Sequence, residues 1–188
     1  KLELPEARDL LVRAVEVSPE HPLPRAALAE AWLALGHDRK AEEQAREAIH
    51  RSGQLRREDR MFVEGRLHEI CKDYGRAIES YRALTTFFPD ELEYGLRLAG
   101  AQTLAGRGKE ALGTLAILRK LPLPAAEDPR IWLGEAAAAN SLSDYARELA
   151  AARGAAERAE AIGARLLLGR ARISEAAALV RLGRQAEA

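Results

Sequence analysis

The residues that could bind a metal ion are spread along the chain. Its four histidines, His21, His37, His50 and His68, include no pair three or four residues apart, and no histidine–carboxylate ligand pattern surrounds them. A zinc site needs three or four such side chains at one point, and two ligands on one helix face are a usual sequence sign of it. The sequence therefore predicts no metal site and no cofactor.

A short glycine-rich segment resembles part of a phosphate-binding loop. Residues 106–110 read Gly-Arg-Gly-Lys-Glu, which offers a glycine and a lysine of the kind that hold phosphate groups. The likeness ends there, because Thr103 stands at the position of the first glycine and Glu110 follows the lysine in place of Ser or Thr. We interpret the segment as a turn between two helices.

One cysteine has neighbours that could activate it as a nucleophile. Cys71 follows His68 by three residues, which places both on one helix face, and Lys72 is adjacent. Nearby cationic groups lower the pKa of a thiol, so a reactive thiolate is one interpretation. A small packing residue is the preferred one, because Leu35 and Ala105 hold the corresponding positions of similar segments.

The acidic and basic residues form no recognisable catalytic group. No Gly-x-Ser-x-Gly elbow occurs, and carboxylates alternate with arginines at helical spacing, as Glu42 does with Arg46 and Glu47 with Arg51. Such pairs are typical of a solvated helix surface. We therefore expect no catalytic residue in this segment.

Composition and charge restrict the class of partner. Lys plus Arg and Asp plus Glu both number 29, so no net charge attracts nucleic acid or an anionic membrane surface. No apolar run is long enough to span a membrane, and residues 1–13 are amphipathic where a secretory signal would be hydrophobic. We expect a cytoplasmic segment that inserts into no membrane and binds no nucleic acid directly. A membrane anchor elsewhere in a longer protein is an open alternative.

The elements that position these residues form a repeat. An alanine ends each of a series of similar polar turns, at Ala7, Ala41, Ala77, Ala111, Ala146 and Ala188. Successive markers lie 34, 36, 34, 35 and 42 residues apart. Apolar residues recur three and four positions apart after a marker and again before it, which is the pattern of one buried face on each of two helices. Each repeat therefore predicts two antiparallel helices.

This pattern predicts ten helices and no strand. We expect the helices at residues 4–17, 22–36, 38–51, 57–72, 74–88, 91–106, 108–120, 128–141, 143–162 and 163–182. Gly36 and Gly106 end helices that precede a marker, and Pro19, Pro89 and Pro122 separate one hairpin from the next.

The period, the stripe of small and large residues and the proline at the end of a unit resemble the tetratricopeptide repeat (TPR) family over the whole chain. The resemblance implies an all-α fold, a right-handed α-solenoid of antiparallel helix pairs with about ten helices, in a single repeat domain over residues 1–188. The sequence departs from the family at Gly53, which replaces the proline, and at residues 54–57, which lengthen a loop. We also expect truncated repeats at both ends of a fragment of a longer array, because the chain starts at Lys1 inside a second helix and stops at Ala188 where another begins.

Four short stretches are similar to the repeat regions that follow serine/threonine kinase domains or winged-helix DNA-binding domains in bacterial regulators. They are residues 27–31 (Ala-Leu-Ala-Glu-Ala), 87–90 (Phe-Phe-Pro-Asp), 94–99 (Tyr-Gly-Leu-Arg-Leu-Ala) and 128–131 (Asp-Pro-Arg-Ile). This resemblance implies a bacterial signalling protein whose output domain, such as a kinase, lies outside this sequence.

In such a solenoid the first helix of each hairpin lines a concave groove. Counting from the markers gives a groove of mixed apolar and acidic character, in which aromatic and arginine side chains would supply most of the binding energy. The candidate contact residues are Glu30, Phe62, Arg66, Glu69, Arg97, Ile131, Trp132 and Glu135. Packing between repeats, or a place on the solvated surface, is the alternative role for each. Trp32 is expected in the core between the two helices of its hairpin.

We therefore expect a non-catalytic scaffold that binds another protein or a peptide in the groove, as a regulatory or docking region of a larger bacterial signalling protein. The alternative is a ligand-sensing segment that controls an attached kinase or DNA-binding domain. An enzyme domain built on Cys71 and His68 is a third hypothesis. The sequence does not determine the partner's identity or the oligomeric state.

Overall fold

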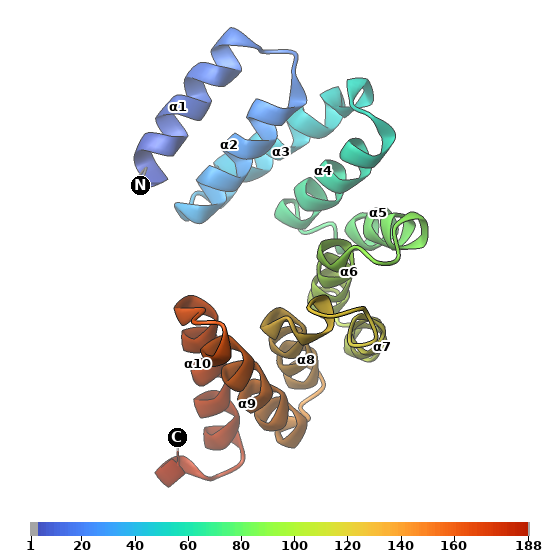
Figure 1. Ribbon diagram of the computed structural model, residues 1–188. Coiled ribbons are helices and arrows are strands. Elements are labelled where there is room, and N and C mark those ends of the chain that lie inside the picture. Colours follow the sequence, from blue (N-terminus) through green and yellow to red (C-terminus); the bar gives the residue numbers. More distant parts are fainter. Residues whose placement is uncertain (1–3, 188) are drawn as a thin grey trace. The chain divides into compact units, whose positions relative to one another are not determined.

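The computed structural model describes residues 4–187 and consists of helices joined by short turns (Figure 1). The helices are α1 (Leu4–Val17), α2 (Pro22–Ala34), α3 (Asp38–Arg51), α4 (Arg57–Ile70), α5 (Tyr74–Phe87), α6 (Leu92–Leu104), α7 (Gly108–Leu118), α8 (Pro129–Ser141), α9 (Tyr145–Ala161) and α10 (Arg165–Arg181). Three 3-10 turns lie at Ser52–Gln54, Ala125–Glu127 and Gln185–Glu187. The ten helices predicted from the sequence are confirmed in the described part of the chain.

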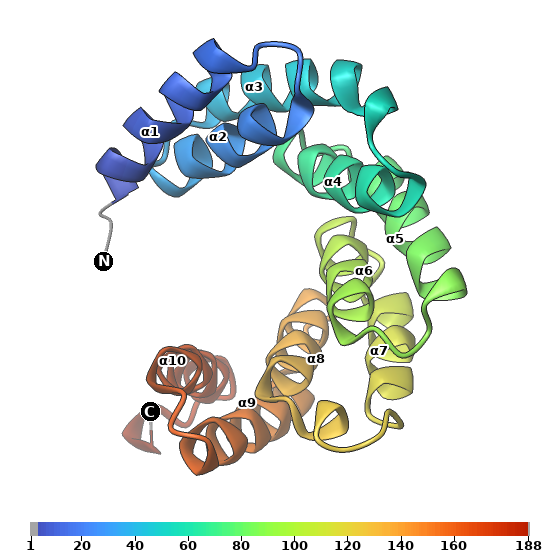
Figure 2. The ribbon, with the colours of Figure 1, turned by 45° about the horizontal axis from the view of Figure 1, so that its top comes forward.

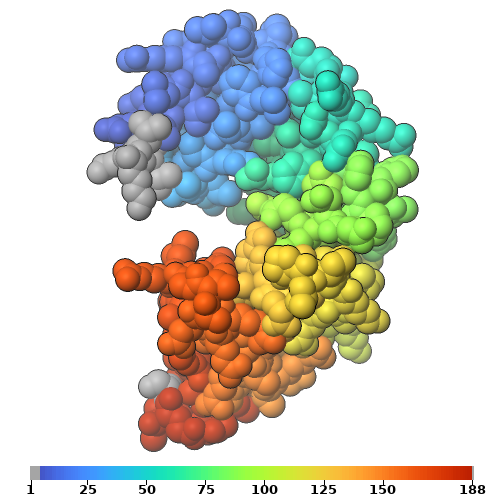
Figure 3. Space-filling view, viewed as in Figure 1, coloured from blue at the N-terminus to red at the C-terminus, as the bar shows by residue number. Residues whose placement is uncertain are grey.

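The chain divides into two compact units, which we call unit 1 (Lys1–Phe87, with α1 to α5) and unit 2 (Phe88–Ala188, with α6 to α10). In both, consecutive helices pack as antiparallel pairs, and the first helices of neighbouring hairpins also touch, α2 with α4 and α8 with both α6 and α10 (Figures 1 and 2). The space-filling view shows the blue and cyan helices of unit 1 in contact along the visible face (Figure 3). The predicted all-α fold of sequential antiparallel pairs is confirmed.

The turn inside each hairpin contains one residue in the left-handed conformation. This residue is Gly36, Lys72, Gly106 or Ser143, with φ of 76°, 59°, 74° and 58° respectively. A left-handed residue at this point closes the helix by returning its N–H to a carbonyl of the last turn, as Gly36 does to Leu33 at 2.9 Å. In the first three hairpins the helix therefore ends two residues before the predicted boundary.

The second helix of each hairpin carries its buried stripe at a fixed distance from that turn residue. Ala41, Ala77 and Ala111, each five residues after it, are completely buried, as the repeat predicts. In the fourth hairpin the same position is occupied by Glu148, whereas the predicted marker, Ala146, is exposed. The predicted marker was wrong by two residues there. Ala146 also stands at the end of a polar turn, but α9 begins at Tyr145, and the residue that points into the seam is Glu148.

Small residues on the first helix allow the two helices of a hairpin to approach closely. Ala29, Gly65, Ala99 and Ala136 all lie seven residues before their turn residue, and all are buried. At Gly65 the contact is so close that a Cβ atom would lie 2.7 Å from Cε1 of Tyr81, whose side chain is fully buried. Alternation of small and large residues across this seam fixes the position of α4 against α5.

The loop after α3, which residues 54–57 were expected to lengthen, contains a 3-10 turn. Gly53 lies in the 3-10 turn Ser52–Gln54, and α4 begins at Arg57. The expected chain ends at Lys1 and Ala188 lie outside the described residues, so the truncated repeats stay a prediction, as does the single repeat domain.

Candidate protein-interaction site

A surface pocket opens between α2 and α4, the first helices of two neighbouring hairpins in unit 1. We call it the α2/α4 pocket; it has a volume of about 270 Å³ and is lined by Leu23, Ala26, Ala27, Glu30, Phe62, Val63, Arg66 and Leu67. Three of the eight predicted contact residues, Glu30, Phe62 and Arg66, are therefore brought together by the fold. The remaining lining is mostly apolar, so the pocket is suited to an apolar side chain.

The packing beneath the pocket fixes its walls. Leu67 is completely buried and Ala26 is 7% exposed, and both belong to the core cluster that joins α2, α3 and α4. The Phe62 ring stands edge-on to the ring of Tyr81, with 6.5 Å between centroids, so a buried residue of α5 supports it. Leu23 at the rim keeps 44% of its surface exposed and is available to a partner.

An ion pair crosses the rim from one helix to the other. The Arg66 Nη2 atom lies 2.7 Å from Glu30 Oε2, and the two side chains are 31% and 37% exposed. The Arg66 guanidinium also lies 5.7 Å from the centre of the Phe62 ring. A half-exposed pair of this kind contributes only about 0–1 kcal/mol to folding, so a partner can exchange it for its own charged group at low cost.

The other predicted residue of unit 1 and two of those in unit 2 are partly exposed but do not line this pocket. Glu69 is half-buried on α4, three residues after Arg66. On α6, Arg97 pairs with Glu93 at 3.1 Å. On α8, Glu135 is held between Arg119 at 3.1 Å and Arg147 at 2.8 Å, with 12% of its side chain exposed.

Two predicted contact residues are core residues. Ile131 is fully buried and Trp132 is 5% exposed, both in the main core cluster of unit 2. The guanidinium groups of Arg119 and Arg158 lie 4.3 and 3.7 Å from the Trp132 ring centre, and a Cβ atom at Gly154 would touch the ring at 2.7 Å. We therefore correct the expectation for Ile131 and Trp132, because α7 and α9 cover the part of α8 that carries them.

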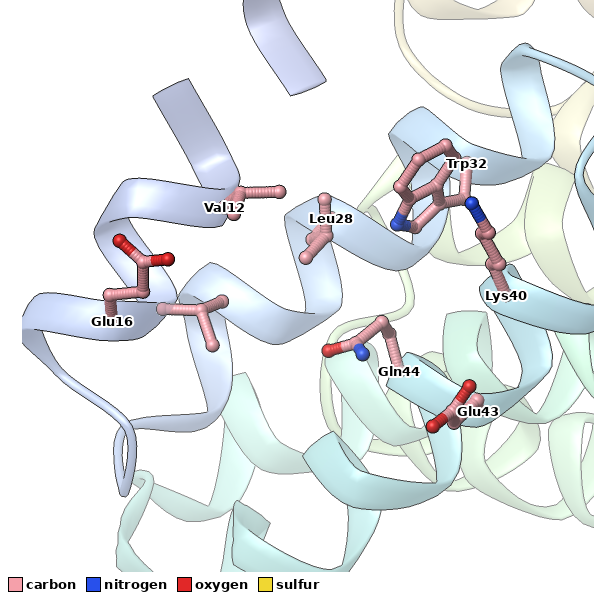
Figure 4. Close-up of a pocket in the computed structure, with 8 residues that line it drawn as sticks. Val12, Glu16, Leu28, Trp32, Lys40, Glu43 and Gln44 are labelled. Atoms are coloured by element: carbon pink, nitrogen blue, oxygen red, sulfur yellow. The ribbon is translucent and has the colours of Figure 1, made fainter. Parts of the chain in front are cut away.

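Trp32, which was expected in the core, packs against the core cluster of α2, α3 and α4 but is not fully buried itself. Its ring is half-buried, with the Lys40 ammonium 4.3 Å and the Arg8 guanidinium 5.3 Å from its centre. A second pocket of about 310 Å³ lies beside it, lined by Val12, Val15, Glu16, Leu28, Trp32, Lys40, Glu43 and Gln44. Figure 4 shows Val12 of α1 pointing toward Leu28 of α2, with Trp32 and Lys40 next to each other. No residue pattern indicated this pocket, because its lining comes from three helices, α1, α2 and α3.

The surroundings of Cys71 oppose its use as a nucleophile. Burial raises the pKa of the Cys71 thiol above its usual value, and burial also lowers the pKa of His68. The thiol is thus kept protonated and the imidazole neutral, the reverse of an activated ion pair. Within residues 4–187, no group of three or more His, Cys, Asp or Glu side chains is placed to hold a metal ion.

The described helices also include none that is both long and apolar enough to cross a membrane.

Sequence analysis missed one buried charged residue, Glu148. The signal was present, because Asp144-Tyr145-Ala146-Arg147-Glu148 aligns with Asp73-Tyr74-Gly75-Arg76-Ala77. The alignment places Glu148 opposite Ala77, at a position that the repeat reserves for a buried residue.

Comparison with known proteins identifies the fold. No family model and no curated protein matches the sequence, whereas solved structures do match the chain. TTC0263, a thermophilic TPR protein of Thermus thermophilus, superposes with a TM-score of 0.66 at 19% identity, over 94% of this chain and 91% of that one. A tetratricopeptide repeat protein from Parabacteroides merdae gives 0.61 at 16% identity, over 98% and 69% of the two chains. BtubC (BKLC) from P. vanneervenii gives 0.62 at 16% identity, over 100% and 87%.

At these identities the likeness concerns the fold alone. The chain has a TPR-like fold, as its repeat predicted. Nothing in these likenesses concerns a kinase or a winged-helix domain.

Proposed function

We propose that this protein is a non-catalytic scaffold that binds a peptide segment of another protein at the α2/α4 pocket. The observation that supports it best is that Glu30, Phe62 and Arg66, selected as contact residues from their repeat positions, line one partly exposed apolar pocket. Proteins that carry TPR folds generally mediate contacts between proteins. The balanced charge of the chain argues against nucleic acid as the direct partner.

The pocket's chemistry suggests how the partner is held. An apolar side chain placed over Leu67 and against the Phe62 ring would gain about 1.5–3 kcal/mol from leaving water. A charged or polar group next to it in the partner would engage Arg66 or Glu30, which already face each other across the rim. Aromatic and arginine side chains are the residues that most often dominate binding energy, and this pocket contains one of each.

Affinity capture with purified protein tests the proposal. The bait is the wild type, and the test variant combines Phe62→Ala with Arg66→Glu, which removes one wall and reverses the charge at the rim. A matched control combines Val17→Ala with Arg39→Glu, two exposed positions of unit 1 outside the pocket. We expect the wild type and the control to recover the same protein and the test variant to lose it. Equal recovery by all three would contradict the proposed site.

The regulatory context is a further part of the proposal. We infer a cytoplasmic docking region of a larger bacterial signalling protein, supported by the similarity of residues 27–31, 87–90, 94–99 and 128–131 to regions that follow kinase or winged-helix domains. Sequencing the complete gene tests it, because a kinase or winged-helix domain in the same reading frame is the expected result.

The second candidate function is a ligand-sensing segment that controls such an output domain. The observation that favours it is a polar pocket in unit 2, between α8 and α10, with a buried carboxylate among its lining residues. A scaffold needs no such buried charge.

A further inference from the structure

Unit 2 buries a carboxylate at a position that three other hairpins give to alanine. Glu148 is 3% exposed and lies on the seam between the helices of its hairpin, where Ala41, Ala77 and Ala111 stand in theirs. An alanine there completes the packing without polar cost. A buried carboxylate has to be satisfied by hydrogen bonds or by opposite charge, so its presence needs a reason beyond packing.

The partners of Glu148 come from both neighbouring helices. Asn140 of α8 donates its Nδ2–H to Oε2 at 2.9 Å. From α10, Arg181 Nη1 lies 3.3 Å from both carboxylate oxygens and the Ser174 hydroxyl lies 3.4 Å from Oε1. Only the Asn140 bond has an ideal length, and the Arg181 side chain is 41% exposed. The carboxylate thus accepts four contacts, and the two long ones from the partly exposed Arg181 are those that a ligand cation would replace.

A pocket leads to this carboxylate from the surface. It has a volume of about 290 Å³ and is lined by Leu133, Ala137 and Asn140 of α8, Glu148 of α9, and Arg170 and Ser174 of α10. Arg181 does not line it. The pocket thus contains an apolar side, Leu133 and Ala137, and a polar side on which a buried anion and an exposed cation are both present.

Arg170 supplies the cation. It is exposed and forms no hydrogen bond or ion pair among residues 4–187. It precedes Ser174 by four residues on α10, a rise of about 6 Å, and Ser174 is the residue of α10 in the pocket that reaches Glu148. Arg170 and Ser174 therefore lie on one side of α10, and both line the pocket that contains Glu148.

We propose that this pocket binds a free basic amino acid, with the side-chain ammonium or guanidinium on Glu148 and the carboxylate on Arg170. The ligand's methylene groups lie against Leu133 and Ala137. Lysine and arginine carry a cation at one end, a carboxylate at the other and a hydrocarbon stem between them, and the pocket lining offers a group for each of the three. The polar pair would thus select for charge at both ends, and the apolar side for the hydrocarbon stem between them.

A polypeptide whose last residue is lysine or arginine carries the same cation and carboxylate at its C-terminal end. The free amino acid is the ligand that we favour, because the pocket is small, about 290 Å³, and is lined by six residues of α8, α9 and α10. This site belongs to unit 2 and is independent of the α2/α4 pocket, so the two proposals can fail separately.

Isothermal titration of the purified chain with defined probes tests the inference. L-lysine and L-arginine are compared with cadaverine and agmatine, which keep the distal cation and lack the carboxylate, and with L-norleucine, which lacks the distal cation. We expect lysine or arginine to bind at least tenfold more tightly than the three analogues. The tripeptide Gly-Gly-Lys distinguishes a peptide end from a free amino acid, and we expect it to bind more weakly than lysine.

Two variants assign the contacts. Arg170→Gln changes an exposed side chain, so folding should be unaffected. It should weaken the binding of lysine at least tenfold and leave the binding of cadaverine unchanged. Glu148→Gln should abolish the advantage of lysine over norleucine, with circular dichroism checking that the helices remain. No binding of lysine or arginine to the wild type, or equal binding by Arg170→Gln, would overturn the inference. Tighter binding of Gly-Gly-Lys than of lysine would overturn the choice of a free amino acid.

Discussion

The left-handed turn residues offer a test of the repeat register. Backbone geometry determines whether a substitution at one of them raises or lowers the free energy of unfolding. Gly36 and Gly106 hold this position in two hairpins, but Lys72 and Ser143 hold it in the others with φ of 59° and 58°. A residue with a Cβ atom pays about 1–2 kcal/mol in this conformation. Glycine avoids that strain, but it lowers the free energy of unfolding by about 0.5–1 kcal/mol because the unfolded chain has more conformational freedom. Replacing Lys72 or Ser143 by glycine should therefore stabilise the protein by about 0.5–1 kcal/mol.

Ser143→Gly is the cleaner of the two changes. The Lys72 ammonium lies 3.8 Å from Asp38, and this exposed pair contributes at most about 1 kcal/mol that Lys72→Gly would remove. The assay is urea unfolding followed by circular dichroism, with unchanged dependence on denaturant as the check that only stability has changed. Because Lys72 and Ser143 lie in different units, the double variant should show nearly the sum of the two effects.

Gly106→Ala is the matched control. A Cβ atom there would meet nothing within 4 Å, so any loss is conformational. It should destabilise by about 1 kcal/mol, the reverse of Ser143→Gly. If Ser143→Gly leaves stability unchanged or lowers it while Gly106→Ala is harmless, the turn assignment, and with it the position of Glu148, is wrong.

Three further predictions concern Gly65, His68 and Cys71, which all lie in unit 1. Gly65→Ala should lower the free energy of unfolding by about 1–3 kcal/mol in a thermal or urea melt, because its Cβ would lie 2.7 Å from the Tyr81 ring. The control is Gly100→Ala, whose Cβ meets nothing within 4 Å and which should be neutral or stabilise by up to about 1 kcal/mol. Burial lowers the pKa of His68 below 6.5, so the native state favours the neutral imidazole. The unfolded state binds the proton more readily, and the free energy of unfolding should therefore fall as the pH drops below 6.5. The same urea series with His68→Gln should lack this part of the pH dependence; an identical profile would contradict the assignment. Because burial raises the pKa of Cys71, a thiol-specific reagent should label the native protein at least about tenfold more slowly than the urea-unfolded chain, and equal rates would revive the enzyme hypothesis.

The helices were predictable because the same physical rule recurs in every repeat. A residue on the seam, such as Ala77, is fully buried in the structure for the reason that its spacing indicated. The helix ends were harder, since the predicted boundary fell on the left-handed residue itself, Gly36, Lys72 or Gly106, whereas each helix ends two residues earlier. Glu148 was missed because a convenient alanine, Ala146, lay two residues away, although the shared Asp-Tyr-x-Arg segment pointed to the correct register.

The candidate site was predictable only in part. Phe62 and Arg66 line a pocket because both stay partly exposed on the part of α4 that faces α2. Ile131 and Trp132 were chosen in the register of Ala146, which is wrong by two residues; counted from the turn residue Ser143, the position of Phe62 is occupied on α8 by the partly exposed Leu133.

The most direct test of the scaffold proposal maps where a captured partner touches the protein. A photo-crosslinking side chain is placed at Leu23, which lines the α2/α4 pocket and is 44% exposed, and in a second variant at Glu79, an exposed position of α5 outside it. We predict that the partner recovered by the wild type crosslinks to position 23 and not to position 79, and that adding Phe62→Ala and Arg66→Glu removes the adduct. A partner that crosslinks at position 79 but not at position 23, or an adduct that survives both substitutions, would contradict it.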